Sequence, residues 1–192
     1  MTRHQFTPTD FEHPHPIEDF VDATLKNWLG EWLLYNPVIR SCQLRGDERV
    51  LDFGCGSGVG SRAIARRLSA GGRLTCLDTS GFWIERARRR LRRFDHVDFV
   101  QCDVRQAELP AASYDVITIF YVLHDIAPPE RPAIVEALAR LMRSGARLYI
   151  YEPTKPSHGM PAREIRQLMA GAGLREGSSR PQRRAYLGTY RA

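Results

Sequence analysis

The stretch Val50–Gly60 constrains the fold of this chain more than any other part of the sequence. It opens with the apolar run Val50–Phe53, which predicts a short buried strand, and continues into a turn rich in glycine. Residues 61–70 then have the pattern of a helix. Strand, glycine turn and helix in this order commonly bind a nucleotide-like cofactor, because the main chain can approach the ligand closely at glycine. The start of the helix adds free N–H groups and a partial positive charge.

The spacing of the glycines distinguishes between cofactor classes. Gly54, Gly56 and Gly58 directly follow Asp52 at the end of the predicted strand. A dinucleotide-binding pattern can also be read from Gly58 onward, but it begins several residues past the strand and ranks second. A turn without a ligand explains the alternating glycines poorly, because each glycine costs conformational entropy.

Composition limits the remaining possibilities. A length of 192 residues fits one domain with a full core, and 43% hydrophobic and 26% charged residues are ordinary for a globular protein. The sequence shows no apolar run long enough for a membrane span and no signal-peptide pattern, so we expect a cytoplasmic protein. The cysteines form no C-x-x-C pair and fit no zinc pattern, which predicts buried free thiols and no metal site: Cys42, Cys55, Cys76 and Cys102.

The net charge of +6 comes largely from arginine, which is concentrated between Arg86 and Arg93. On a helix, Ala87 and Leu91 can face the core while the arginines cover the solvent side. The pattern favours a solvated helix face over a docking patch for nucleic acid or another anion.

Four further strands are predicted after the glycine turn, and the first two end in an acid: Arg73–Asp78, residues 96–103, Tyr114–Phe120 and residues 146–151. Ligands of doubly wound sheets bind outside the carboxyl ends of the strands. Asp78 is therefore placed to accept hydrogen bonds from ribose hydroxyls. The alternative role for Asp78 is a helix N-cap, which Thr79 or Ser80 could fill instead.

The two ends of the chain differ in character. Residues 1–16 follow no regular pattern, and residues 17–40 read as a helix with an aromatic stripe that either packs on the sheet or covers an apolar pocket. Residues 174–179 and 184–190 predict a closing hairpin. We expect a single compact domain overall. Residues 46–192 would form its cofactor-binding part, and residues 1–45 would form a flap and helix that cover the site.

Taken together, these motifs resemble those of class I S-adenosylmethionine-dependent methyltransferases, in particular the small ubiquinone/menaquinone-biosynthesis-type (methyltransferase type 11) enzymes. The resemblance covers roughly Arg45 to Arg191 and rests first on the Asp-x-Gly-x-Gly-x-Gly motif at Asp52–Gly58. It implies an α/β fold, namely a doubly wound, Rossmann-like, seven-stranded, mostly parallel sheet with an antiparallel last strand and helices on both faces. It implies S-adenosylmethionine as the cofactor.

The resemblance also implies roles for individual residues. The glycine loop would pass under the methionine part of the cofactor, Asp103 would bond the adenine amino group, and the N–H of Val104 would read a ring nitrogen. Trp83 lies near where adenine could stack. The cofactor-binding set predicted in this way comprises Asp52, Gly54, Cys55, Gly56, Gly58, Asp78, Thr79, Trp83, Asp103, Val104 and Phe120.

The segment Tyr121–Asp125 follows the fourth strand, where this family places the methyl group and its acceptor. His124 is the candidate general base, with Asp125 or Tyr121 as its orienting partner. A structural hydrogen bond is the alternative role for His124. The loop lacks the Pro-Pro motif of enzymes that methylate amino groups of nucleic-acid bases, which argues against nucleic acid as the acceptor.

The sequence therefore predicts a methyltransferase acting on an O, N or S atom of a small, apolar or aromatic molecule. Two alternatives remain open: an RNA-modifying enzyme that uses the arginine face, and an NAD-dependent oxidoreductase or non-catalytic cofactor-binding module. Peripheral membrane contact is a variant that the basic surface suggests. We expect a monomer or homodimer.

Overall fold

The computed structural model describes residues 35–69, 71–155, 158–181 and 184–192. The predicted flap and aromatic helix before Tyr35 lie outside the described residues, so both stay predictions.

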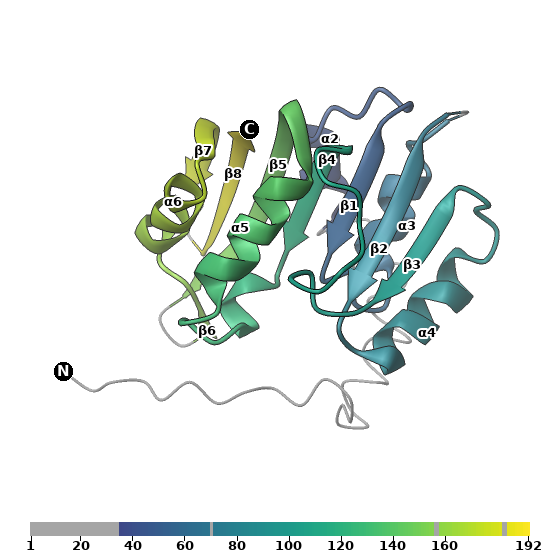
Figure 1. The fold of residues 1–192 in the computed structure, drawn as a ribbon, viewed down its shortest axis with the longest axis horizontal. Coiled ribbons are helices and arrows are strands. Elements are labelled where there is room, and N and C mark those ends of the chain that lie inside the picture. Colours follow the sequence, from purple (N-terminus) through teal and green to yellow (C-terminus); the bar gives the residue numbers. More distant parts are fainter. Residues whose placement is uncertain (1–34, 70, 156–157, 182–183) are drawn as a thin grey trace.

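A mixed β-sheet forms the centre of the molecule (Figure 1). Its strands are β1 (Arg49–Phe53), β2 (Arg73–Asp78), β3 (Val97–Gln101), β4 (Tyr114–Phe120), β5 (Met142–Lys155), β6 (His158–Gly159), β7 (Arg175–Pro181) and β8 (Ala185–Arg191). The main path has the order β3-β2-β1-β4-β5-β8-β7, and β6 pairs with the end of β5. Neighbours from β3 to β5 are parallel, whereas β8 is antiparallel to both β5 and β7. The predicted seven-stranded path with an antiparallel last strand is confirmed.

Helices cover both faces of this sheet. They are α2 (Asn36–Ser41), α3 (Val59–Ala65), α4 (Gly81–Leu91), the short 3-10 helix η2 (Leu123–Asp125), α5 (Arg131–Leu141) and α6 (Ala162–Gly171). Residues of α2, α3 and α4 share one buried core with one side of the strands. Residues of α5 and α6 form the other core, and both helices lie in front of the sheet in Figure 1. Within the part of the chain that the structure describes, no helix combines the length and apolar character needed to cross a membrane.

The sequence pattern accounts for most of these elements. β2 and β4 have the bounds that the sequence predicts. Both strands are buried on two faces, and such strands appear in the sequence as continuous apolar runs. Ser144 and Gly145 have the composition of a helix end, yet both residues lie within β5. Gly145 has φ +76°, and the pairing of β5 with β4 is irregular between Tyr114 and Val116. The chain therefore leaves α5 and enters the sheet without a separate turn.

Parallel strands bring their carboxyl ends to one edge of the sheet. β1, β2, β3 and β4 all end there, and the loops that follow them carry the predicted site residues. We call this the carboxyl edge. The order of the strands reverses between β1 and β4, which is where ligands bind in open α/β sheets.

Candidate functional site

Asp78 meets the glycine loop at the carboxyl edge. Its Oδ2 accepts a hydrogen bond of 2.9 Å from the N–H of Gly56, and its Oδ1 accepts one of 3.0 Å from the N–H of Ser80. Ser80, and not Asp78, caps α4, because its hydroxyl accepts from the N–H of Trp83. The carboxylate thus stands at the tip of β2, beside the loop from β1, as the sequence predicts. Thr79 is exposed next to it.

Two glycines of the loop show what its geometry requires. Gly54 has φ +67°, and a Cβ built there would come within 2.5 Å of a methyl carbon of Val122, so a larger residue would displace the loop after β4. Gly56 also has a positive φ, +50°, but a Cβ at this position would meet nothing within 4 Å. The main chain at Gly56 therefore borders open space beside the Asp78 carboxylate.

The alternative dinucleotide pattern gains no support from the structure. Gly58 is the N-cap of α3, and Gly60 lies inside the helix. A Cβ on Gly60 would lie 3.0 Å from the ring of Tyr35, which identifies that glycine as a packing position. Cys55 is buried, and its N–H bonds the carbonyl of Leu77.

Asp52 braces the base of the loop. It is 4% exposed, and its two carboxylate oxygens accept hydrogen bonds from the hydroxyls of Ser61 at 2.6 Å and Thr118 at 2.7 Å. Burial raises the pKa of Asp52 to about 6, and the two hydroxyl donors only partly oppose this effect. The side chain thereby ties β1 to α3 and β4. Its predicted contact with a cofactor stays a prediction.

Aromatic and arginine side chains cluster at the start of α4. The rings of Phe82 and Trp83 meet edge to face with centroids 4.9 Å apart. The guanidinium of Arg86 lies 4.8 Å from the Phe82 centroid and 6.0 Å from that of Trp83. Arg90 donates to the carbonyl of Ser57 in the glycine loop. Arg86 and Arg90 of this helix therefore have contacts within the protein, and the predicted choice of a solvated face over a docking patch stays a prediction.

Asp103 follows β3 at the same edge. Its carboxylate accepts from the backbone N–H of Arg105 at 2.9 Å and pairs with the guanidinium of that residue. The hydrogen bond from the Arg105 side chain lowers the pKa of Asp103, so the group stays ionised. Arg105 also pairs with Glu130. Val104 is buried in the core beside α5. Arg105 was not among the predicted site residues, although its spacing from Asp103 suits a turn.

Glu152 lies near the end of β5 and organises the loop after β4, a role that the sequence analysis missed. Its side chain is fully buried. Its Oε1 accepts from the N–H groups of Val122 and Leu123 at 2.8 and 2.9 Å, and its Oε2 lies 2.7 Å from Nδ1 of His124. On the other side, Nε2 of His124 is 3.4 Å from the carboxylate of Asp125. The acid at the end of β5 was a usable signal, as it was for β2.

Arg131 of α5 braces the same loop by bonding its carbonyl groups. Its Nε donates to the carbonyl of Ile126 at 2.9 Å, another nitrogen donates to the carbonyl of His124 at 3.2 Å, and its guanidinium pairs with Glu164 of α6. The loop that carries His124 is therefore fixed from β5 and from α5. This arrangement gives His124 a defined position at the carboxyl edge.

Aromatic rings line the chain where β4 ends. Tyr121 has φ +60°, an uncommon conformation for a residue with a side chain, and its N–H bonds the carbonyl of Tyr151. Its ring meets that of Tyr151 at 5.1 Å and that of Tyr35 at 6.2 Å. Tyr35 also approaches Phe120 at 6.5 Å. Burial and the hydrogen bond with Tyr151 raise the pKa of Tyr121, so its hydroxyl stays protonated.

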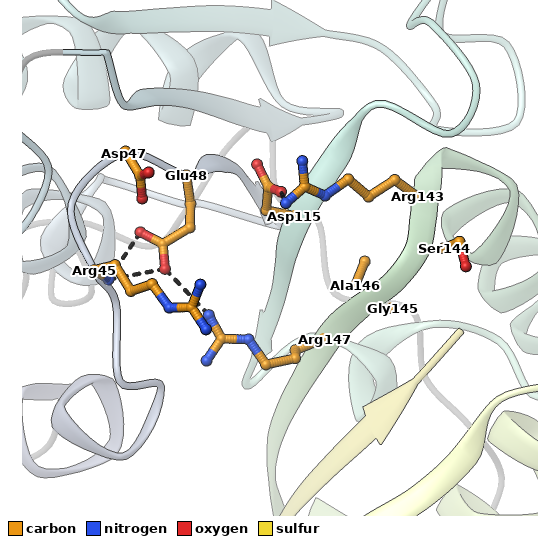
Figure 2. Close-up of a pocket in the computed structure, with 9 residues that line it drawn as sticks. All are labelled: Arg45, Asp47, Glu48, Asp115, Arg143, Ser144, Gly145, Ala146 and Arg147. Atoms are coloured by element: carbon orange, nitrogen blue, oxygen red, sulfur yellow. Dashed lines mark hydrogen bonds and ion pairs between the residues drawn. The ribbon is translucent and has the colours of Figure 1, made fainter.

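A charged cavity of about 220 Å³ lies at the opposite edge of the sheet, where β1, β4 and β5 begin (Figure 2). Glu48 accepts there from the N–H groups of Arg45 and Gly46, and pairs with Arg147 at 3.1 Å. Arg143 pairs with Asp115. The charges that line this cavity thus neutralise one another, and it is remote from the carboxyl edge. No cluster of three metal-ligating side chains occurs among residues 35–69, 71–155, 158–181 and 184–192.

Comparison with known proteins identifies the domain. Residues 50–145 match the family described as "Methyltransferase domain". The chain belongs to this family. The predicted family and fold are confirmed, and the cofactor of this family is S-adenosylmethionine. The open space beside Gly56 and the carboxylate of Asp78 are compatible with such a cofactor, and their contacts with it stay predictions.

Relatives share part of their length with this chain. A demethylmenaquinone methyltransferase of Clavibacter sepedonicus is 32% identical over 57% of this chain and 42% of its own length. A ubiquinone/menaquinone biosynthesis C-methyltransferase, UbiE, of Shewanella halifaxensis is 26% identical over 63% of this chain and 49% of its own. The chain thus spans less than half of either relative.

Solved structures agree with the fold. A methyltransferase described as SAM-dependent, from Aquifex aeolicus, superimposes with a TM-score of 0.75 at 18% identity, covering 93% of this chain and 98% of that one. A TehB-like methyltransferase of Corynebacterium glutamicum gives a TM-score of 0.74 at 17% identity, covering 92% and 99%.

Proposed function

We propose that this chain transfers the methyl group of S-adenosylmethionine to a small, apolar or aromatic acceptor. The observation that supports the proposal is the hydrogen bond from the N–H of Gly56 to Asp78, which joins the carboxylate at the end of β2 to the open glycine turn after β1. The predicted acceptor atom is O, N or S. Carbon joins these candidates, because one relative is named a C-methyltransferase.

The residues at this edge divide into two groups. Asp78 would accept from the ribose hydroxyls, Asp103 would face the adenine amino group, and the glycine loop would underlie the methionine part. The loop after β4 would hold the acceptor, with the rings of Phe120, Tyr121 and Tyr151 next to it. Aromatic rings beside this loop would favour a flat, hydrophobic acceptor over a nucleic-acid base in a polyanionic strand.

The chemistry needs position more than covalent help from the protein. When bound, S-adenosylmethionine supplies a methyl group on a positively charged sulfur, and that sulfur keeps the electron pair of the broken S–CH₃ bond. The rigid loop after β4 would align the acceptor, and alignment alone is worth about 7–11 kcal/mol in favourable cases. The carboxylate of Asp78 suits a cationic ligand, whereas the charge of Asp103 is already balanced by Arg105.

Calorimetric titration with S-adenosylhomocysteine tests the proposal. The wild-type chain should bind this thioether, and NADH, the control ligand, should not bind. Asp78→Ala should weaken binding by about 10- to 100-fold, since a charge-assisted hydrogen bond is worth about 1.5–3 kcal/mol. Asp98→Ala is the matched control, because Asp98 lies on β3 in an exposed ion pair with Arg73. Preferential binding of NADH, or no binding of the thioether, would refute the proposal.

A further inference from the structure

We propose that Glu152, His124 and Asp125 form a proton relay, and that the acceptor is one that must release a proton as it receives the methyl group. Glu152 acts as a positioning residue, His124 takes the proton, and Asp125 passes it toward solvent. This inference rests on the proposed function and specifies the acceptor class of the same site.

The contacts of Glu152 show that one of its oxygens is reserved for the imidazole. Oε1 alone satisfies the N–H groups of Val122 and Leu123. Oε2 lies 2.7 Å from Nδ1 of His124. A carboxylate needed only to hold the loop would be satisfied by the two backbone donors. The second oxygen fixes the orientation of the ring and favours a proton on Nδ1, and in this orientation Nε2 lies 3.4 Å from the carboxylate of Asp125.

Charged groups surround the imidazole on several sides. Glu152 faces it from β5 and Asp125 from η2, while Arg131 reaches the carbonyl of His124 from α5 and is neutralised by Glu164 of α6. Strand β6 also contacts η2 and carries His158, whose side chain lies outside the described part of the structure. Burial disfavours the charged imidazolium, but the hydrogen bond with Glu152 and the negative charges of Glu152 and Asp125 outweigh it, so the pKa of His124 is raised.

Exposure increases along the three side chains. Glu152 is 0% exposed, His124 is 5% exposed and Asp125 is 25% exposed. Nε2 of His124 and the Asp125 carboxylate are 3.4 Å apart, which is within reach of a proton transfer after a small adjustment. The proton path thus leads from the buried imidazole of His124 to the partly exposed carboxylate of Asp125, while Glu152 holds the imidazole from the buried side.

The proton balance is simple. The acceptor loses its X–H proton to Nε2 of His124 while its X–CH₃ bond forms, and the positive charge moves from the sulfur to the imidazole. Oε2 of Glu152 stabilises the resulting imidazolium. Nε2 then returns the proton to water through Asp125. A base of raised pKa is stronger once deprotonated, which suits a weakly acidic acceptor such as a phenol.

Nuclear magnetic resonance of the imidazole nitrogens gives the first test. His124 should titrate above the ordinary histidine range in the wild type, and its signals can be assigned with His124→Gln. Glu152→Gln removes the charge but keeps the side-chain shape, so the His124 midpoint should move down. Glu48→Gln is the matched control: Glu48 is also buried, accepts two backbone N–H groups and pairs with a cation, but lies at the other edge. An unchanged His124 midpoint in Glu152→Gln would overturn the relay.

Methylation of a matched pair of probes, 2-naphthol and 2-naphthalenethiol, separates a relay from a merely structural contact. A thiol releases its proton more readily than a phenol. Glu152→Gln should lower kcat for the naphthol by about 100-fold and leave kcat for the thiol within about threefold. The wild-type rate with the naphthol should rise with pH through the His124 midpoint, because only neutral imidazole accepts a proton, and the rise should move to lower pH in Glu152→Gln.

The variant Asp125→Asn and the binding of S-adenosylhomocysteine provide two further tests of the relay. Asp125→Asn leaves Glu152 in place, so it tests the relay even where Glu152→Gln fails to fold, and it should also slow the naphthol reaction selectively. Equal losses with both probes would refute the relay. If the losses are equal but the wild type still binds S-adenosylhomocysteine, the proposed function stands without the relay. If the wild type does not bind S-adenosylhomocysteine, both the proposed function and the relay are refuted.

Discussion

Replacing Asp52 with asparagine should remove a pH-dependent cost to stability. Asp52 is buried at the base of the glycine loop, and its pKa is raised from its ordinary 3.8 to about 6. Between these values the folded chain holds a proton on Asp52 that the unfolded chain has lost. The unfolding free energy therefore falls as pH rises. The stabilisation is complete below pH 3.8 and has disappeared above pH 6.

The size of the effect follows from the width of this window. A shift of about two pKa units at 1.36 kcal/mol per unit gives about 3 kcal/mol. Asparagine has nearly the same shape and cannot ionise. Its amide can hydrogen bond to the hydroxyls of Ser61 and Thr118, since the Thr118 hydroxyl also lies 3.4 Å from the carbonyl of Leu51 and can redirect its own proton there.

Urea denaturation of wild type and Asp52→Asn at a series of pH values measures this difference. The unfolding free energy of the variant, taken relative to that of wild type, should rise by about 3 kcal/mol between pH 3.8 and about pH 6. Asp98→Asn, which alters an exposed ion pair with Arg73, is the control and should change by less than about 1 kcal/mol. Parallel curves for wild type and Asp52→Asn would show that burial does not raise the pKa of Asp52, and the reasoning would fail.

Two more predictions concern the supports of the site. Gly54→Ala should lower the unfolding free energy by about 2–4 kcal/mol, because the new Cβ would collide with Val122. Gly145→Ala is the control: this glycine also has a positive φ but faces open space, so its substitution should cost about 1–2 kcal/mol. Equal losses in urea denaturation would contradict the steric explanation. Arg131→Met should lower the unfolding free energy by about 3 kcal/mol, because it leaves carbonyls of the η2 loop without their donor. Arg73→Met, which removes an exposed ion pair, is the control and should lower it by less than about 1 kcal/mol. Similar melting temperatures for these two variants would show that Arg131 does not brace the loop.

Local sequence was sufficient for the features that depend on neighbouring residues. The apolar run of β2 ends at Asp78, and that of β4 ends at Phe120, as predicted. Asp78 was placed at the glycine loop because parallel strands end at one edge of the sheet. The capping role of Ser80 could also be read from the sequence, since a serine before a helix commonly bonds the third residue after it.

Features that depend on distant pairing could not be read in the same way. Glu152 bonds groups 28 to 30 residues earlier in the chain, and nothing in the local pattern of β5 specifies that contact. Ser144 and Gly145 resemble a helix end, yet the pairing of Met142 with Tyr114 draws them into the sheet. The strained backbone of Tyr121 is likewise held by Tyr151 across the strands.

The pairing of β5 with β8 has a consequence for the order in which the site is built. Strand β8 flanks β5 from Arg147 to Pro153, so the strand that bears Glu152 lacks its second neighbour until residues 185–191 have been synthesised. The glycine loop and Asp78, by contrast, are flanked by strands that are all complete by Phe120. On the ribosome, the half of the sheet that carries the glycine loop can assemble first and the half that carries Glu152 last. A chain truncated before Ala185 would keep the glycine loop yet leave one edge of β5 open.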